Sequence, residues 1–478
     1  MATLSLCMIV KNEEKHLPGC LKSAKEAVDE IIVVDTGSTD RTIEIAKLFG
    51  AKSYYFKWDN DFAAARNEAI KHATSDYILW MDADERLNKA DLNKLLALKH
   101  NLPLDKKTAF AVEIVNYRKG KFPETAYQTR IFPNLPNIKF KGKICEQISF
   151  SLAESGINFK VSNVKIRHLG YLTPQIWKNK LQRNLPILKA TLAQKGTSEE
   201  NWDIHYYLGI SYLNLKEFSL AQEHLMQVLT KDCSFKNPSF YISAAIELAK
   251  LLKANGKDHQ ALQILLKLKS EFPQNDLVLC TLGKFLYEQK EYKKAIQALS
   301  QCQPQKIHLE VVPISKKDYI FEYYKYLGLC YEALNYMAQA ITAFKKAIEV
   351  KPHSPYLIAH LCSLLLFKTN QIEEAIFYLI KGINLMEKRG IPTAKHEVYI
   401  ALCLMLAIVF ARQCRIEECV FLAERLLKSI RYPSVRLIHK LEELAAIYQE
   451  IGKYLQDKNL IWANLAFDTA RQLLCLKV

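Results

Sequence analysis

Two aspartates two residues apart, Asp82 and Asp84, directly follow an apolar run in the stretch YILWMDADERL. A strand that ends there would present both carboxylates at one edge of a sheet. Paired carboxylates at such an edge can hold a hard divalent cation, which usually takes a few protein oxygens together with the phosphates of a substrate. A second run, Ile31–Val34, ends in the same way on Asp35, and Gly37 allows a tight turn behind it. These positions predict a site for a charged ligand.

The same spacing recurs at Asp59 and Asp61 in WDNDF, which supplies an internal control. Those two residues precede a predicted helix, where capping of the first backbone N–H groups explains them. Only the pair after the apolar run is therefore a metal candidate. Asp35 has two explanations: its carboxylate accepts hydrogen bonds from a ligand, or it caps its own turn while Thr39 or Asp40 caps the next helix. This stretch alone leaves both open.

The first 100 residues alternate between strand and helix patterns. Apolar runs predict strands at 4–10, 31–34, 53–58 and 77–81, and helical periodicity predicts helices at 11–28, 41–49 and 62–73, the second closed by Gly50. Continuous apolar strands that alternate with helices imply a mostly parallel sheet covered on both faces. Ligands of such sheets bind outside the carboxyl ends of the strands, which is where the three aspartates are expected.

Four motifs in this order, CMIVKNEE, VVDTGSTD, DFAAARNEA and WMDADE, resemble the family 2 inverting glycosyltransferases. The resemblance continues more loosely through QTRIFPN, FKGKICEQI and IRHLGY to about residue 195. It implies an α/β GT-A fold, Rossmann-like with a mostly parallel sheet, and a nucleotide-diphosphate sugar as the donor, a UDP-sugar first. The expected glycosyltransferase domain covers residues 1–195 and includes a linking helix in WKNKLQRNLPILKATLAQKG.

The resemblance also implies a role for each matching residue around the donor. Asp35 would contact the nucleobase, and Glu13 and Arg66 would frame the nucleotide. Asp82 would lie near the ribose, and Asp84 would bind Mn²⁺ or Mg²⁺ that bridges the diphosphate. A bound cation suits this chemistry because transfer builds negative charge on the departing diphosphate.

Two further positions match the family's pattern. His168, at the end of KIRH, matches a further metal ligand, although the residue type alone also fits a surface or loop histidine. Glu146 matches the base that takes the acceptor's proton during a single displacement with inversion, while its alternative is a solvated glutamate on a strand. Cys145 stands where the family usually has histidine, which puts in doubt any help from a neighbouring imidazole.

The second half of the chain repeats itself. In YKYLGLCYEALNYMAQAITAFKKAIEVKP, small and large residues fall at the positions of a tetratricopeptide helix pair: Gly328, Tyr331, Ala340, Phe344, Ala347 and Pro352. Other copies place Gly209 with Ala221, Ala249 with Ala261, Gly283 with Ala295, Ser363 with Ala375, and Ala407 with Cys419. We expect about six pairs and a weaker closing segment, Leu437 to Leu476, in an all-α superhelix over residues 196–478. It could bind a protein or peptide, the acceptor included, or act as a stabilising tail.

Composition limits the other possibilities. The formal net charge is +16, and residues 101–180 hold 14 Lys and Arg against 5 Asp and Glu. This stretch lacks the motifs of a nucleic-acid module, so no nucleic acid is expected as a partner. Its basic residues either lie on solvated strand faces or form an anion-binding patch, and both alternatives stay open.

The longest apolar run, Val398 to Ala411, is shorter than the roughly 18–20 residues of a membrane span and predicts a buried helix. No leader sequence is recognised, and the twelve scattered cysteines indicate reduced thiols, so we expect a cytoplasmic location.

Two functions from different classes fit these observations. The first is a metal-dependent inverting glycosyltransferase whose repeats recruit an acceptor or a partner. The second is a tetratricopeptide scaffold with a transferase-like domain that binds a ligand but is inactive. The carboxylates at Asp35, Asp82, Asp84 and Glu146 favour the first, because an inactive domain would be expected to lose one. A nucleotidyltransferase is a distant third, since the chain has no N-terminal glycine-rich phosphate loop. The sugar, the base of the nucleotide, the acceptor and the oligomeric state do not follow from the sequence.

Overall fold

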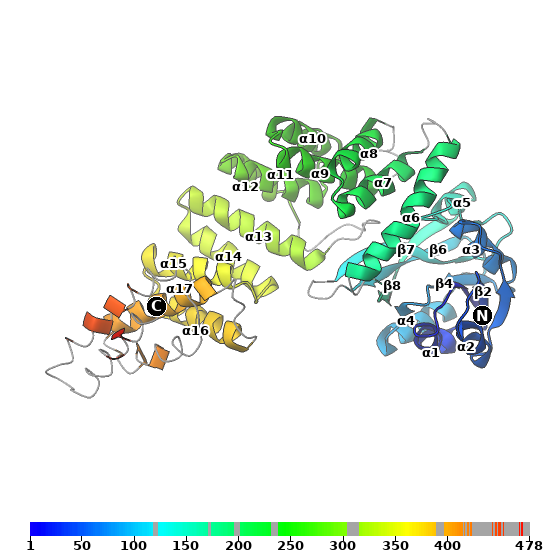
Figure 1. Cartoon of the computed structure of the whole chain (residues 1–478), viewed down its shortest axis with the longest axis horizontal. Coiled ribbons are helices and arrows are strands. Elements are labelled where there is room, and N and C mark those ends of the chain that lie inside the picture. The colour runs from blue at the N-terminus through cyan, green and yellow to red at the C-terminus, as the bar shows by residue number, and fades with distance from the viewer. Residues whose placement is uncertain are drawn as a thin grey trace. The chain divides into compact units, whose positions relative to one another are not determined.

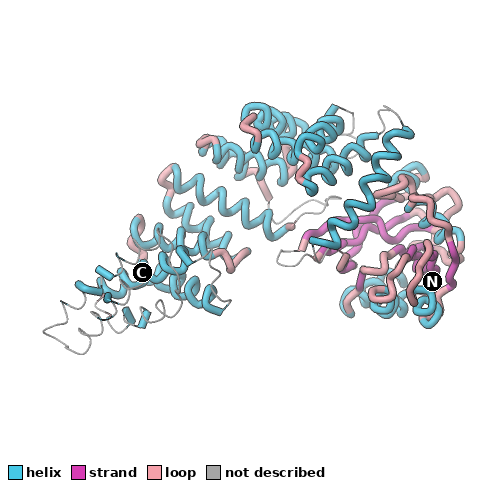
Figure 2. The backbone as a smooth tube through the Cα atoms, in the orientation of Figure 1, coloured by secondary structure: helices cyan, strands magenta, loops and turns pink. Residues whose placement is uncertain are grey.

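The computed structural model describes residues 1–117, 123–170, 174–195, 201–230, 238–303, 315–388 and 396–413, with scattered positions beyond 413 (Figures 1 and 2). The chain divides into two compact units. One comprises Met1–Leu282 and Gln305–Tyr319, and the other comprises Gly283–Pro304 and Ile320–Val478. The sheet and the helices that cover it lie in the first unit.

The described strands form one eight-stranded sheet in the order β3-β2-β1-β4-β7-β6-β8-β5. Their bounds are β1 Leu4–Val10, β2 Glu30–Asp35, β3 Lys52–Tyr55, β4 Tyr77–Trp80, β5 Glu85–Arg86, β6 Thr108–Asn116, β7 Glu124–Pro133 and β8 Asn158–His168. The pairs β1–β2, β1–β4, β2–β3 and β6–β8 are parallel, and β4–β7, β6–β7 and β5–β8 are antiparallel. The predicted α/β class with a mostly parallel sheet is confirmed.

Helices cover both faces of this sheet, as the alternation of buried side chains requires. On β1, Leu4, Leu6 and Met8 join one buried cluster, which also contains side chains of α1 (Leu17–Ala24), α2 (Thr42–Leu48) and α4 (Lys89–His100). Cys7 points to the other face and packs in a second cluster with α3 (Phe62–Lys71) and α5 (Ser149–Glu154). Successive strand residues point to opposite faces, so a run that is apolar throughout must be covered on both.

The predicted helix 11–28 was too long at its start. The backbone turns at Asn12, which has a φ of 56°, and α1 begins only at Leu17, with a proline in its first turn. Proline suits that place because its missing N–H has no partner there. Residues 11–16 therefore form a loop after β1, and this loop brings Glu13 to the carboxyl edge of the sheet. The third strand is also shorter than predicted and ends at Tyr55.

A helical region follows. It begins with α6 (Pro174–Lys195), which contains the predicted linking helix, and continues with α7 Trp202–Leu215, α8 Phe218–Thr230, α9 Pro238–Ala254, α10 Asp258–Glu271, α11 Asp276–Glu288, α12 Tyr292–Leu299, α13 Lys316–Ala333, α14 Met337–Val350, α15 Pro355–Phe367, α16 Ile372–Lys388 and α17 His396–Arg412. The predicted apolar run lies in α17, where Leu402, Leu406 and Phe410 are buried. None of the described helices is both long and apolar enough to cross a membrane.

Small residues bring the paired helices together as the repeat pattern predicts. A Cβ added at Gly209 would lie 2.8 Å from the side chain of Leu225, and one at Gly328 would lie 2.6 Å from the ring of Phe344. The large side chain thus fills the space that the glycine leaves. Most of the expected closing segment, Leu437 to Leu476, lies outside the described residues, and the boundary at residue 195 stays a prediction. Among the described cysteines all are buried except Cys145, which is half-buried.

Candidate active site

The carboxyl ends of three neighbouring strands bring the predicted acidic residues to one edge of the sheet. Because β1 pairs with both β2 and β4 in parallel, the loop after β1, the end of β2 and the loop after β4 lie side by side. They carry Glu13, Asp35, and Asp82 with Asp84. Burial and, to a lesser extent, the neighbouring charge of Asp84 raise the pKa of Glu13 to about 7.

Asp35 organises its own turn. Its carboxylate accepts hydrogen bonds from the backbone N–H groups of Gly37 and Ser38 and from the Ser38 hydroxyl, at 2.5–3.3 Å. Asp40 does the same at the start of α2, where it accepts from the backbone and hydroxyl of Thr42. The capping explanation of Asp35 is therefore confirmed, and its contact with a nucleobase stays a prediction.

Arg66 joins two of the predicted site residues. Its Nε donates to Oε1 of Glu146 at 2.5 Å, and its Nη2 donates to Oδ1 of Asp82 at 2.8 Å. The guanidinium also lies over the ring of Trp80, 4.1 Å from its centroid. The Arg66 side chain is only 8% exposed, so these charge-assisted bonds are largely shielded from water. Residues far apart in the sequence thus meet at a single group.

A second buried ion pair fixes the loop that carries the two aspartates. Arg130, on β7, donates to both carboxylate oxygens of Glu85 at 2.9 and 2.7 Å, and its guanidinium lies 3.5 Å from the centroid of the Trp80 ring. Glu85 in turn accepts from the backbone N–H of Asp82 at 2.9 Å. The sequence prediction missed Glu85 and Arg130. Two features of the sequence could have indicated them: a charged residue next to the aspartate pair, and an arginine inside an apolar strand.

Asp84 lies next to His168, the last residue of β8. Nε2 of His168 lies 3.4 Å from Oδ1 of Asp84, because β5 and β8 pair in antiparallel register at Glu85 and His168. Nδ1–H of His168 donates to Oδ1 of Asn116 at 2.8 Å, which orients the ring and leaves Nε2 toward the carboxylate. Burial alone would raise the pKa of Asp84, but the His168 ring and the neighbouring Lys180 hold that pKa below its usual range.

Comparison with known proteins identifies the sheet domain. Residues 5–153 match the family model described as glycosyl transferase family 2. The N-terminal part of the chain is a family 2 glycosyltransferase domain. A tetratricopeptide repeat model matches residues 323–354, so this domain is followed by repeats of that family.

Two relatives and one solved structure describe how far the similarity reaches. The chain is 42% identical to a TPR repeat-containing protein of Synechococcus elongatus over 36% of this chain and 43% of that protein. It is 29% identical to the SPbeta prophage-derived glycosyltransferase SunS of Bacillus subtilis over 57% of this chain and 64% of that protein. The chain thus spans less than two thirds of each relative. The C-terminal part of a TPR repeat-containing protein from Cytophaga hutchinsonii matches 55% of this chain and 96% of that one at 17% identity, with a TM-score of 0.43.

The glycosyltransferase domain offers two side chains to a divalent cation. Ligands at about 2.1 Å from one octahedral cation lie about 3 Å apart, which fits the 3.4 Å between the facing atoms of Asp84 and His168. No group of three or more His, Cys, Asp or Glu residues within the described parts of the chain is arranged as a metal site. Asp84 and His168 therefore fit a cation that takes its remaining ligands from a substrate, as diphosphate-bound Mn²⁺ or Mg²⁺ does.

The loop that carries Glu146 is held from two sides. Backbone hydrogen bonds in both directions between Lys141 and Gln147 close it, and the carbonyl of Lys143 accepts from the N–H of Phe62 at the start of α3. Cys145 has a φ of 53°, and the side chain of Tyr207 on α7 lies close to its thiol. The first repeat helix thus touches the loop of the glycosyltransferase domain that bears the expected base.

One residue of the control pair, Asp61, behaves as predicted. Asp61 directly precedes α3 and accepts from the backbone N–H of Ala64 at 2.9 Å, so it is a helix cap.

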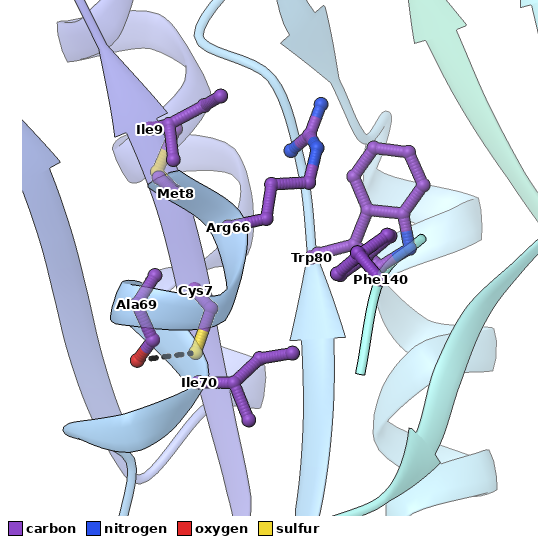
Figure 3. A pocket seen from close by; sticks show the side chains of 8 residues that line it. All are labelled: Cys7, Met8, Ile9, Arg66, Ala69, Ile70, Trp80 and Phe140. Atoms are coloured by element: carbon purple, nitrogen blue, oxygen red, sulfur yellow. Dashed lines mark hydrogen bonds between the residues drawn. The ribbon is translucent and has the colours of Figure 1, made fainter. Parts of the chain in front are cut away.

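A pocket beneath Arg66 is lined by Cys7, Met8, Ile9, Arg66, Ala69, Ile70, Trp80 and Phe140 (Figure 3). Its volume of about 10 Å³ is at the lower limit for one water molecule, so it is a packing gap and not a site for a sugar.

Proposed function

We propose that the chain is a metal-dependent inverting glycosyltransferase that uses a nucleotide-diphosphate sugar, a UDP-sugar first. The observation that supports this most strongly is the link through Arg66. One buried guanidinium is bonded both to the expected base, Glu146, and to Asp82, the carboxylate expected at the donor. A base and a donor site must be adjacent for a single displacement, because the acceptor oxygen attacks the same carbon that the diphosphate leaves.

In this proposal each residue of the site has a separate role. Asp35, Glu13 and Arg66 frame the nucleotide, and Asp82 lies near the ribose. Glu146 accepts the proton of the acceptor hydroxyl as the new bond forms.

Asp84 and His168 would hold Mn²⁺ or Mg²⁺, which would supply positive charge to the departing diphosphate. The clustered carboxylates of Glu13, Asp82 and Asp84 would otherwise repel that diphosphate. A cation between the two sets of negative charges removes this conflict.

The tetratricopeptide repeats suit recognition of a protein or peptide, and we assign them the acceptor or a partner. The alternative is a repeat scaffold whose glycosyltransferase domain binds a ligand without turnover. The retained Glu146, held next to Asp82 by a buried arginine, favours an active enzyme. A repeat array that only stabilises the domain would leave acceptor kinetics unchanged when its surface is altered.

A screen of nucleotide sugars tests this function. The full chain is incubated with UDP-, GDP-, ADP- and CDP-sugars, with Mn²⁺ or with a chelator, and hydrolysis and thermal stability are measured. We expect one nucleotide class to raise the melting temperature only with the metal, by mass action on the folded state. Asp84→Asn should abolish this coupling. Asp61→Asn should leave both the coupling and the stability close to wild type, because asparagine caps a helix about as well as aspartate. Equal stabilisation in the presence of chelator contradicts the metal assignment.

A further inference from the structure

The helix between the sheet and the repeats brings a lysine to the metal residues. Lys180, in the second turn of α6, places its Nζ 3.3 Å from Oδ2 of Asp84. Its side chain is 28% exposed, and that of Asp84 is 14% exposed. The contact therefore lies at the mouth of the site, where a ligand can reach the ammonium group.

Three polar atoms converge over one glycine at this point. A Cβ added at Gly170 would lie 2.1 Å from Oδ2 of Asp84, 2.6 Å from Nε2 of His168 and 2.6 Å from Nζ of Lys180. Lys180 therefore shares the space in which Asp84 and His168 would hold a cation. Any diphosphate bound to that cation comes within reach of the lysine.

Other contacts fix the course of α6 along the glycosyltransferase domain (Figure 1). The guanidinium of Arg183 lies 5.0 Å from the centroid of the Phe62 ring, and near the end of α6 the side chain of Gln194 accepts from Nζ of Lys143 at 3.0 Å. Because these contacts hold α6 one turn after Lys180 and again near the end of the helix, the position of Lys180 follows from the packing of the domain. A flexible four-carbon stem still lets the ammonium move by a few ångströms.

The charges around the site indicate a role for Lys180. Glu13, Asp82 and Asp84 gather at the site, and Arg66 is already engaged with Asp82 and Glu146. The separation of 3.3 Å between Lys180 and Asp84 exceeds the roughly 2.7–2.9 Å of a strong charge-assisted hydrogen bond. A phosphate oxygen can therefore compete with Asp84 for this ammonium group.

We propose that Lys180 binds the diphosphate of the donor and stabilises it as the leaving group. As the anomeric carbon bonds to the acceptor oxygen, its bond to the diphosphate oxygen breaks and that oxygen keeps the electron pair. Lys180 donates a hydrogen bond to the charge that develops there. This inference rests on the proposed function, and it makes the linking helix a part of the active site.

Calorimetry on the full chain tests the assignment. With saturating Mn²⁺, the nucleoside diphosphates UDP, GDP, ADP and CDP are titrated first, and the tightest is compared with its monophosphate. Lys180→Met should weaken diphosphate binding roughly tenfold or more, the usual effect of losing one charged hydrogen bond, and change monophosphate binding less than about twofold. Lys180→Arg should recover most of the loss. Lys178→Met, at an exposed position two residues earlier, is the matched control and should bind like the wild type.

Four results would overturn the inference. Unchanged diphosphate affinity in Lys180→Met, with a wild type that binds well, contradicts the inference and leaves the proposed function standing. Equal losses for diphosphate and monophosphate, or no recovery in Lys180→Arg at an unchanged melting temperature, would reduce Lys180 to a structural contact. If the wild type binds none of the four diphosphates with Mn²⁺, the proposed function fails and this inference fails with it.

Discussion

Arg66 donates a hydrogen bond of 2.5 Å from its Nε to Oε1 of Glu146, although 80 residues separate them in the sequence. The other side of the same guanidinium contacts Asp82. The arginine thus aligns the expected base with the carboxylate expected at the donor. A planar group with several N–H donors in a fixed arrangement is well suited to hold two carboxylates at once.

Removal of this arginine should cost both stability and activity. Arg66→Met leaves Glu146 and Asp82 without their buried counter-charge, and loss of one partner of a buried ion pair typically costs about 3 kcal/mol or more. We therefore expect a lower free energy of unfolding in denaturant titrations and little transfer. Arg66→Lys should recover part of the stability but less of the activity, because an ammonium cannot reproduce the two directed bonds. Wild-type stability of Arg66→Met would show that the bridge is absent in solution.

Gly170, beside the residues proposed to bind the metal, should not tolerate a side chain. In Gly170→Ala the added carbon would lie 2.1 Å from Oδ2 of Asp84, so the carboxylate or the backbone must move. We expect the folded protein to lose the metal-dependent rise in melting temperature on adding the nucleotide. Gly256→Ala is the control for backbone strain, since that glycine has a φ of 73° and nothing within 4 Å of the added carbon. A normal nucleotide response in Gly170→Ala would argue against Asp84 as a metal ligand.

The first repeat helix should affect catalysis through the loop of Glu146. The side chain of Tyr207 lies close to the side chains of Cys145 and Gln147, which flank the expected base, Glu146. Loss of the hydroxyl in Tyr207→Phe removes a polar contact worth about 1 kcal/mol, so it should lower kcat about fivefold and leave donor binding unchanged. Its neighbour Tyr206 bonds instead to Ser243 at 3.1 Å, so Tyr206→Phe should keep kcat at the wild-type value. Equal kcat values for both variants would mean that α7 does not position the base.

Much of the sheet follows from local sequence patterns. The apolar run at Leu4 to Val10 has no polar face, which requires cover on both sides, and the structure gives it helices on both. The aspartates after β2 and β4 meet because parallel strands end at one edge. The start of α1 was misjudged since the loop of Asn12 and Glu13 has a helix-like composition, and only Pro18 marks the true beginning.

The side-chain network could not be predicted in the same way. Trp80 was expected only as a strand residue, yet its ring lies against both Arg66 and Arg130. Lys180 reaches Asp84 from a helix expected only to link two domains. Such contacts depend on how β7 and α6 pack against the sheet, and no local periodicity encodes that packing. The cytoplasmic location and the nature of the acceptor also stay predictions, because no contact in the site depends on either of them.

Substitution of Glu146 by glutamine is the most direct test of the proposed mechanism. Glutamine keeps the size of the side chain and can still accept the bond from Arg66, but it cannot take a proton. Donor binding with Mn²⁺ should be measured by calorimetry, and transfer should be measured by product formation on the same sample. We predict donor affinity close to wild type with kcat lower by roughly 10²–10⁴. A Glu146→Gln enzyme that keeps most of its transfer rate would contradict the account, since the base would then lie elsewhere.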